Sequence, residues 1–342
     1  MSTAVAVVLL LGVVAYAVLG GADFGAGFWD LTAGGAERGA RPRGVIEHAI
    51  GPVWEANHVW LIFVFVVLWT SFPEAYASIT LTMFVPLTLA ALGIVLRGTG
   101  FAFRKVVATT RVRRVLGGAF ALSSVLVPYC MGAIAGGIAS GRVPAGGRAG
   151  DPVTSWVNPT SVLGGVLAVA TVAYLAAVYL VWDSRRLQDA GHAEYFRRRA
   201  VAAGVVAAVL LAVGFLVLRA DAPYLFDGLT SWGLVPVVLG LLCGGGAFLL
   251  LVRGATTGAR VLAAAAVAGV VVSWGVGQWP YLLPTSLTVD AAAAPSGTLT
   301  AVLVAVALAV LLVVPGFVLL FTLDQRGLLP DEGVADPWEK GA

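Results

Sequence analysis

Charged residues, cysteine and histidine are all scarce in this chain of 342 residues. Only 11% of the residues are charged, 59% are hydrophobic, and the mean hydropathy is +0.94. Soluble domains carry nearer to about 25% charged residues, so this composition excludes a soluble globular protein. The net charge of +3 gives no indication of nucleic-acid binding. We therefore predict an all-α polytopic membrane protein, whose spans each need about 20 apolar residues.

Groups that hold metals or haem are also few. The two cysteines, Cys130 and Cys243, lie far apart in apolar segments without a CxxC partner, which favours buried thiols over a disulfide or metal site. Three histidines and three methionines occur at no ligand spacing such as HxxxH. The sequence contains no phosphate loop, dinucleotide fingerprint or nucleophile motif. No cofactor, metal or redox centre is expected in this chain itself.

Long apolar runs and the breakers between them predict about nine transmembrane helices. The expected spans are approximately 3–22, 52–72, 76–96, 115–139, 160–182, 200–218, 233–252, 261–279 and 298–321. No connection is long enough for a soluble domain, so residues 1–342 are predicted to form a single transmembrane domain ending in a short cytoplasmic tail, 323–342. Nine helices favour two four-helix bundles plus one extra helix.

Arginines alternate along the connections between the predicted spans. They are frequent after the first, third, fifth and seventh spans, where Arg38, Arg97, Arg185 and Arg253 are examples. The other connections contain fewer basic residues. Basic loops mark the cytoplasmic side. We therefore expect a multi-pass protein of the cell membrane with its N-terminus outside and its C-terminus in the cytoplasm.

The first span ends in GADFGAG, which contains a carboxylate among small residues. Gly21 and Gly25 are four residues apart and form a face that lets another helix approach closely, and we expect Asp23 in the middle of that face. A charged side chain within a span costs roughly 2.5–3.5 kcal/mol on insertion scales. Asp23 therefore needs a structural or functional reason.

The second span begins with GPVWEANHVWLIFV, in which Glu55, Asn57 and His58 introduce three polar groups. By the orientation above, Glu55 and Asp23 lie at similar depth near the cytoplasmic side. A carboxylate in this position either pairs with an arginine or takes up and passes on protons. The alternative is that Glu55 only reaches headgroup water, while Trp54 and Trp60 are interfacial belt residues.

Two further motifs predict helix boundaries. Asn158-Pro159 is typical of a helix start, with Asn as the N-cap and Pro at the first helical position. GQWPYLLPTS, residues 277–286, has prolines four apart, so the helix must break there. The break predicts a kinked, re-entrant or capping segment, and a ligand-binding break is the alternative.

These motifs, in this order, resemble subunit II of cytochrome bd-type quinol oxidases. GADFGAG is similar to the family's DGFDxGxG, and AIGPVWEANHVWLI to its IAPxWDGNxVWLI. RGTGFAFR resembles the family's arginine–aromatic–arginine pattern after the third span. WVNPTSVLGG is similar to its LNPxxLLxG, and PYLLPTSLT to its PxxxPSS region. The resemblance covers residues 20 to about 290 and fits the family's nine-span layout.

The resemblance implies a subunit without haem in a terminal respiratory oxidase. Its partner would be a larger subunit I that carries the b and d haems and the quinol site, and small accessory membrane subunits are allowed for. The complex would reduce oxygen to water with electrons from quinol, take protons from the cytoplasm and generate a proton-motive force. This chain would support subunit I and contribute to proton uptake, and the family pattern allows for a bound structural quinone or lipid.

Individual positions carry over where the motifs match. Glu55 stands where the family has the Asp of its WDGN motif, and Ala102 stands where an acidic residue is usual. The implied proton-pathway candidates are Glu55, Asp23, Asn57 and His58, and the candidates for the subunit interface or for oxygen access are Trp54 and Trp60. Two other readings stay open at this point: a proton-coupled secondary transporter, and a purely structural partner in which Glu55 is incidental.

Overall fold

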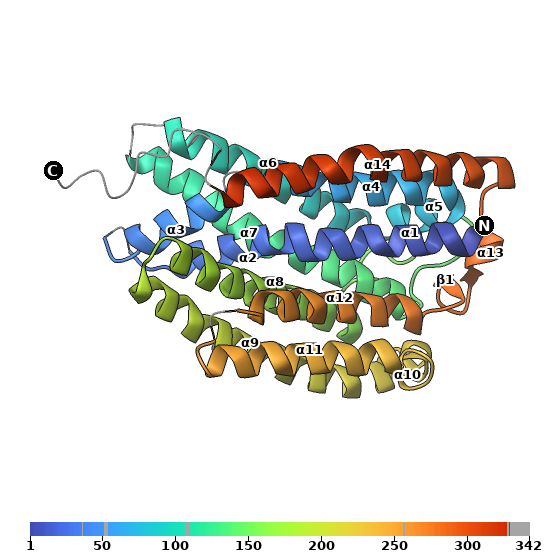
Figure 1. Ribbon diagram of the computed structural model, residues 1–342. Coiled ribbons are helices and arrows are strands. Elements are labelled where there is room, and N and C mark those ends of the chain that lie inside the picture. Colours follow the sequence, from blue (N-terminus) through green and yellow to red (C-terminus); the bar gives the residue numbers. More distant parts are fainter. Residues whose placement is uncertain (36, 51–53, 107–109, 256, 327, 329–342) are drawn as a thin grey trace.

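The computed structural model describes residues 1–342 except 36, 51–53, 107–109, 256, 327 and 329–342. A few side chains inside helices also lie outside the description, among them those of the candidate residues Trp54 and Glu55. The described chain is a bundle of long helices that run along one common axis (Figure 1).

The elements follow the chain in this order: α1 (Ser2–Ala15), the π-helical turn η1 (Tyr16–Gly20), α2 (Gly21–Leu31), α3 (Ala40–Ile50), α4 (Trp54–Ser71), α5 (Pro73–Thr82), α6 (Phe84–Val106), α7 (Thr110–Ala139), α8 (Pro159–Arg186), α9 (Ala190–Asp221), α10 (Pro223–Thr230), α11 (Leu234–Val252), α12 (Ala259–Gly277), β1 (Tyr281–Leu283), β2 (Leu287–Thr288), α13 (Val289–Ala292) and α14 (Ser296–Gln325). Within the described residues, eight helices are long and apolar enough to cross a membrane, and the helix Asn57–Ser71 is a shorter apolar one. The prediction of an all-α polytopic membrane protein is confirmed.

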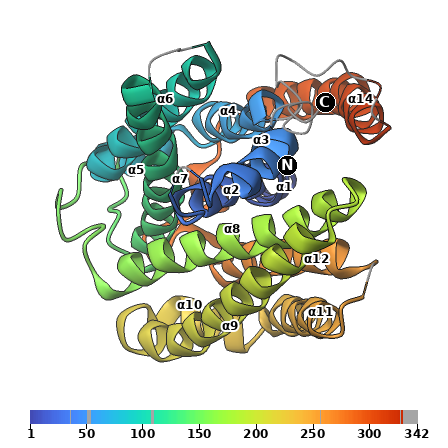
Figure 2. The same cartoon turned by 90° about the vertical axis from the view of Figure 1, so that its left-hand side faces the viewer.

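The long helices form two groups around α8 (Figure 2). In the first group, the continuous helix formed by α1, η1 and α2 packs with α4 and α7, and α7 packs with α6. In the second group, α8 packs with α9 and α12, and α11 packs with α12. The groups meet where α8 contacts α2 and α7, and α14 lies at the edge against α4 and α1. This arrangement corresponds to the two four-helix bundles plus one extra helix that were expected.

The core between the groups is formed mainly by α8. Its residues 172–178 are all buried, and so are Leu180 and Val181. By contrast α14 exposes most of its length, including Leu311 and Leu312. A helix that is apolar all round and exposed faces lipid or another membrane subunit rather than water.

The third predicted span, 76–96, does not match the helices. The chain breaks at Met83, so that α5 ends at Thr82 and α6 runs from Phe84 to Val106. Pro86 lies in the first turn of α6 and cannot donate an amide to the carbonyl of Thr82, which explains the break. The helix then continues past residue 96, and Arg97 lies inside α6 rather than in a loop.

The two helix-boundary motifs behave as predicted, with one addition. The side chain of Asn158 accepts a hydrogen bond from the Ser161 amide at 2.9 Å and caps α8, which begins at Pro159. Helix α12 ends at Gly277, and the proline-containing segment then forms the antiparallel hairpin β1–β2, with Tyr281 opposite Thr288. The sequence predicted the break but not the hairpin.

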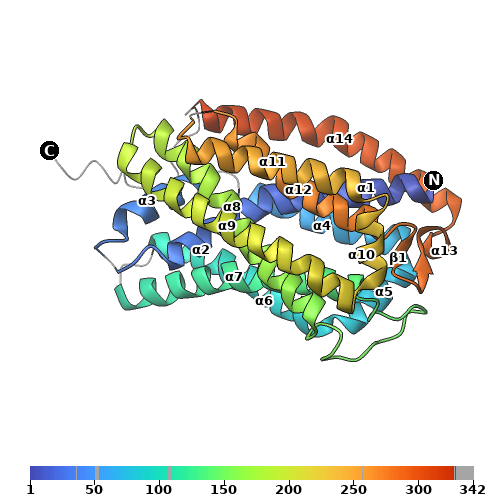
Figure 3. The same cartoon turned by 90° about the horizontal axis from the view of Figure 1, so that it is seen from below.

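The two ends of the bundle differ in their loops (Figures 1 and 3). The N-terminus lies at one end together with α5, α10, β1 and α13, whereas α3 and the α8–α9 connection lie at the other. The second end therefore contains Arg38, Arg43, Arg185 and Arg197. We call it the arginine-rich end. Its assignment to the cytoplasm stays a prediction.

Candidate functional site

Asp23 lies in the interior of the bundle, just after the π-helical turn. Its side chain is 4% exposed. A π-helical turn widens the helix and is common at functional sites. Here the carbonyl of Leu19, within the turn, accepts a long hydrogen bond of 3.4 Å from the Asn57 amide of α4. The turn thus helps to connect the two helices immediately before Asp23.

Asn57 makes the principal contact with the Asp23 carboxylate. The Asn57 Nδ2 donates to Asp23 Oδ2 at 2.8 Å, and both side chains are buried. Asn57 Oδ1 is also buried and has no hydrogen-bond partner among the described residues. Two of the four proton-pathway candidates, Asp23 and Asn57, therefore lie in direct contact.

Arg97 of α6 is the third polar member, and the sequence analysis placed it wrongly in a basic loop. It is only 1% exposed. Its Nη2 donates to the backbone carbonyl of Asp23 at 2.7 Å and its Nη1 donates to Ser124 Oγ of α7. The guanidinium also lies 4.8 Å from the Phe24 ring centre and 4.5 Å from that of Phe120. The apolar run of residues 92–96, which leads directly into Arg97, is the indication that the helix continues there.

The glycines of α2 allow its neighbours to approach. A Cβ at Gly25 would collide with the Val172 carbonyl oxygen of α8 and lie 2.7 Å from Ala176 Cβ. A Cβ at Gly27 would lie 3.0 Å from Arg97 Nη1 and would collide with Ser124. The close approach predicted from the small residues is therefore present.

The expected position of Asp23 in the middle of the glycine face is wrong. Residues two apart in an α-helix point in directions about 200° apart. Gly25 therefore faces α8, while the carboxylate of Asp23 contacts Asn57 of α4. Gly21 and Gly25 therefore occupy a different face of α2 from the Asp23 carboxylate.

An aromatic wall adjoins Asp23. The ring of His58 lies 6.3 Å from that of Tyr16 and 5.8 Å from that of Phe24. Tyr16 Oη is buried without a hydrogen-bond partner among the described residues. We refer to Tyr16, Asp23, Asn57, Arg97 and Ser124 as the Asp23 cluster; neither Tyr16 nor Ser124 was a sequence-based candidate.

Three other candidates are placed less fully. The side chains of Glu55 and Trp54 lie outside the described residues, although the backbone of both belongs to the first turn of α4. Trp60 is half-buried and stacks on Phe317 of α14, with ring centres 5.9 Å apart. In this structure Trp60 is thus a contact between α4 and α14.

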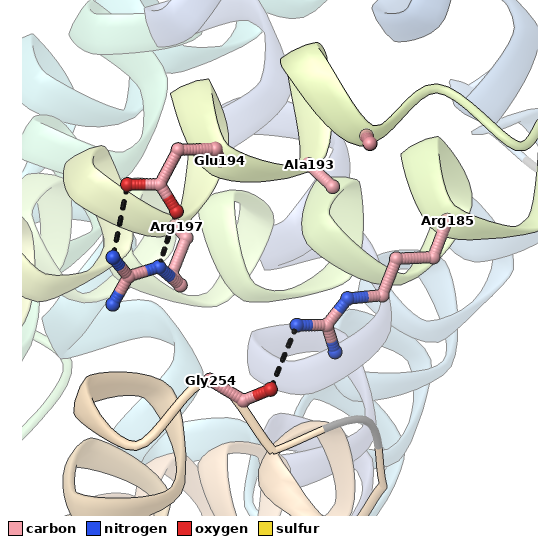
Figure 4. A pocket seen from close by; sticks show the side chains of 6 residues that line it. Arg185, Ala193, Glu194, Arg197 and Gly254 are labelled. Atoms are coloured by element: carbon pink, nitrogen blue, oxygen red, sulfur yellow. Dashed lines mark hydrogen bonds and ion pairs between the residues drawn. The ribbon is translucent and has the colours of Figure 1, made fainter.

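At the arginine-rich end, a small pocket of about 270 Å³ lies between α8, α9 and the connection after α11 (Figure 4). Its polar groups bind one another. Arg197 donates to Glu194 at 2.6 and 2.9 Å, and Arg185 donates to the carbonyls of Ala255 and Gly254 at 2.7 and 3.4 Å. These arginines connect α8 and α9 to the C-terminal end of α11, and we assign no ligand to the pocket.

A second polar cluster lies at the opposite end of the bundle. Asp221 accepts two hydrogen bonds from Arg142, at 2.7 and 3.1 Å, and two from the amide and hydroxyl of Thr160, at 3.1 and 2.6 Å. This arrangement connects the end of α9 to the start of α8. The role of this cluster is structural, because the carboxylate, the guanidinium and the threonine groups are hydrogen-bonded to one another.

Among the described residues, no group of three or more His, Cys, Asp or Glu is arranged to hold a metal ion. His192 contacts Asp189 through Nδ1 at 2.6 Å, and His58 packs in the aromatic wall. Cys130 and Cys243 are both free thiols. That this chain carries no haem stays a prediction.

Comparison with known proteins agrees with the motifs. The sequence pattern that describes "Cytochrome bd terminal oxidase subunit II" matches residues 1–323. The chain is 26% identical over 230 residues to the cytochrome bd ubiquinol oxidase subunit 2 of Bacillus subtilis (strain 168), covering 67% of this chain and 65% of that protein. It is 27% identical over 231 residues to the cytochrome bd-I ubiquinol oxidase subunit 2 of Escherichia coli (strain K12), covering 64% and 57%.

These matches span less than two thirds of the length of either relative. A longer match, at 22% identity over 331 residues, covers 93% of this chain and 94% of the putative cytochrome bd menaquinol oxidase subunit II of Bacillus subtilis (strain 168). The structure of bd oxidase from Geobacillus thermodenitrificans has the same fold, with a TM-score of 0.80, 24% identity, and coverage of 94% of this chain and 98% of that one. None of these relatives is named as a transporter. The chain belongs to the cytochrome bd terminal oxidase subunit II family.

Proposed function

We propose that this chain is the haem-free subunit of a quinol:oxygen oxidoreductase and that the Asp23 cluster carries protons into the complex. The family match over residues 1–323 supports the first part of the proposal. The second part is supported chiefly by the buried contact between Asp23 and Asn57. A carboxyl group at this depth needs a partner in both of its protonation states.

Asn57 can serve both states. When Asp23 is ionised, its Oδ2 accepts the hydrogen bond from Asn57 Nδ2. When Asp23 is protonated, its new O–H needs an acceptor, and the buried Asn57 Oδ1 supplies one after a side-chain rotation or through a water molecule. An amide beside a carboxyl group therefore permits the proton to be gained and lost without leaving a buried polar group unsatisfied.

Arg97 contributes a fixed positive charge close to this exchange. Since it donates to the Asp23 carbonyl and to Ser124, its position does not depend on the charge of the Asp23 carboxylate. Its Nε is buried without a hydrogen-bond partner among the described residues, as is Tyr16 Oη. Water molecules bound to such atoms are the ordinary carriers of protons between fixed groups.

Glu55, in the first turn of α4, is a further proposed carboxylate of the route, with His58 as an auxiliary relay. The arginine-rich end faces the cytoplasm in this proposal, so the N-terminus lies outside and protons reach Asp23 from the cytoplasm. The partner is a larger subunit I, whose b and d haems supply electron transfer from quinol to oxygen. Small accessory subunits, and a structural quinone or lipid, remain compatible with the exposed apolar surface.

For the tryptophans we propose a role at the boundary with subunit I. Trp60 stacks on Phe317 and presents an apolar surface between α4 and the exposed helix α14. Oxygen concentrates in lipid rather than in water, so an apolar channel beside Trp60 would suit its access. Trp60→Ala is expected to change the apparent oxygen affinity more than the proton-uptake rate.

The test uses the complete oxidase, purified with its partner subunit from cells that express Asp23→Asn. We expect normal haem spectra but quinol-dependent oxygen consumption lowered by about 100-fold, the lower end of the effect of a positioned proton-transfer group. Asp23→Glu should retain more activity than Asp23→Asn because it keeps the carboxyl group. Wild-type turnover and proton uptake in Asp23→Asn would contradict the proton role, and the absence of any haem-bearing partner would contradict the oxidase assignment.

A further inference from the structure

A second buried carboxylate lies on the same face of α2 as Asp23. Asp23, Gly27 and Asp30 are spaced at i, i+4 and i+7, which places them in one stripe along the helix. At a rise of 1.5 Å per residue, the two acids are separated by about 10 Å along the axis. Each is only 4% exposed. Asp30 was not among the sequence-based candidates.

The middle of this stripe is occupied by Arg97. Because Gly27 has no side chain, the Arg97 guanidinium reaches the surface of α2 there, with Nη1 3.0 Å from the position of a Cβ. The same guanidinium donates to the Asp23 carbonyl one turn earlier. A cation therefore lies over the helix surface between the two carboxylates, and its unpartnered Nε marks a polar position in that gap.

The outer end of the stripe is connected to the surface. Arg43 Nε of α3 donates to Asp30 Oδ1 at 2.8 Å. Arg43 also donates to the carbonyls of Gly34 and Gly35, at 2.5 and 3.2 Å, in the connection between α2 and α3. Its side chain is 24% exposed, whereas that of Asp30 is 4% exposed. The pair therefore spans the boundary between the bundle interior and the arginine-rich end.

We propose that Asp30 is the outer proton-carrying residue of the route to Asp23. A carboxylate oxygen of Asp30 takes a proton from water at the arginine-rich end while its ion pair with Arg43 loosens. The carboxyl O–H then breaks, and the proton passes through water beside Arg97 to the Asp23 carboxylate, which leaves Asp30 ionised and paired again. The inference rests on the proposed proton role of the Asp23 cluster and adds, beside Glu55, an outer carboxylate through which protons reach it.

The competing interpretation is that the Asp30–Arg43 pair only holds the connection between α2 and α3. The two interpretations differ in what the carboxyl group must do. Asp30→Asn retains a side-chain acceptor for Arg43 but cannot carry a proton, and Asp30→Glu retains the titratable group. Arg43→Gln weakens the contact and leaves the Asp30 carboxyl group in place.

The experiment compares these variants in the complete oxidase, reconstituted into vesicles, by measuring quinol oxidation and proton uptake together. We expect about a tenfold or greater loss of both rates in Asp30→Asn, recovery to within about threefold of wild type in Asp30→Glu, and a smaller loss in Arg43→Gln than in Asp30→Asn. Asp189→Asn, a change at an acid of the same end of the bundle that caps α9 and contacts His192, serves as the unchanged control. Haem spectra and thermal stability confirm assembly.

Each outcome separates this inference from the broader proposal. If Asp23→Asn is slow while Asp30→Asn is as fast as wild type, Asp30 is not on the route but the Asp23 role stands. If neither variant is slow, both proposals fail. Equal losses in Asp30→Asn and Arg43→Gln, without recovery in Asp30→Glu, would support the purely structural interpretation. Should Asp30→Asn not assemble, the neutral double variant Asp30→Asn/Arg43→Gln replaces it. The double variant is expected to show the same loss of quinol oxidation and proton uptake.

Discussion

Arg97 donates to the backbone carbonyl of Asp23 at 2.7 Å, while the carboxylate of the same residue accepts its hydrogen bond from Asn57. One residue of α2 is thus held by its main chain from α6 and by its side chain from α4. This division leaves the Asp23 carboxyl group beside a neutral amide. The cation nearby is fixed by other partners, and the two contacts can be removed separately.

Arg97→Met should destabilise the chain more than Arg97→Lys, and neither should reproduce the wild type. Removing the guanidinium takes away the hydrogen bonds that it donates to the Asp23 carbonyl and to Ser124, whose hydroxyl still donates to the Phe120 carbonyl. A hydrogen bond to a charged group contributes about 1.5–3 kcal/mol. A lysine keeps the charge but lacks the planar fork that reaches both acceptors. The measurement is thermal unfolding of the purified complex in detergent. If Arg97→Met unfolds at the wild-type temperature, the Arg97 contacts contribute nothing to stability.

Gly25→Ala should prevent α2 from packing on α8. Its methyl group would collide with the Val172 carbonyl oxygen and lie 2.7 Å from Ala176 Cβ, and backbone cannot move aside cheaply. We expect a loss of assembled complex, measured as the yield of co-purified partner subunit. Gly118→Ala in α7 is the matched control because a Cβ there meets nothing within 4 Å. Normal assembly of Gly25→Ala would contradict the close packing described here.

Asp221→Ala should cost more stability than Arg142→Ala, although the two residues form one ion pair. Asp221 also accepts hydrogen bonds from the Thr160 amide and hydroxyl, so its removal leaves three donor groups without their acceptor. Arg142 is partly exposed, and a partly exposed ion pair contributes about 0–1 kcal/mol. We expect a loss of about 1–3 kcal/mol for Asp221→Ala. Chemical unfolding of both variants gives the comparison, and equal losses would mean that the Thr160 contacts add nothing.

Asp189 should stabilise the start of α9 only above mildly acidic pH. Hydrogen bonding from the backbone amide of His192 holds the pKa of the Asp189 carboxyl group below its ordinary value. A lowered folded-state pKa means that the contribution is present above the unfolded-state pKa of about 3.9 and is lost as the pH falls through the folded-state value. Asp189→Ala should therefore cost about 1 kcal/mol at pH 7, typical of a lost N-cap.

The same cost should shrink when the pH is lowered from about 5 towards 3, because the wild type then loses the charged cap as well. Asp189→Asn keeps a capping side chain and should lose less than Asp189→Ala at pH 7. Melting temperatures of the three proteins measured across this range provide the check. A constant difference at every pH would show that the charge of Asp189 has no part in the cap.

Composition and hydropathy were sufficient to predict the fold class, since a chain with 11% charged residues has no way to cover a soluble surface. The start of α8 at Asn158-Pro159 was also predictable. The Asn158-Pro159 pair contains its own cap, and the contact that fixes it, with Ser161, lies within the same turn. Signals of this kind depend only on neighbours in the sequence.

Asp23 and Asn57 were predictable as candidates, because a polar group within an apolar helix needs a partner whatever the rest of the chain does. The partner of each polar group was not predictable from the sequence. Arg97 reaches the Asp23 stripe only because Gly27 admits the guanidinium, and Arg43 reaches Asp30 only because α3 turns back towards α2. The sequence by itself determined which side chains could not remain alone in the membrane. Tertiary structure decided which ones meet, since those meetings depend on helices far apart in the chain packing within a few ångströms.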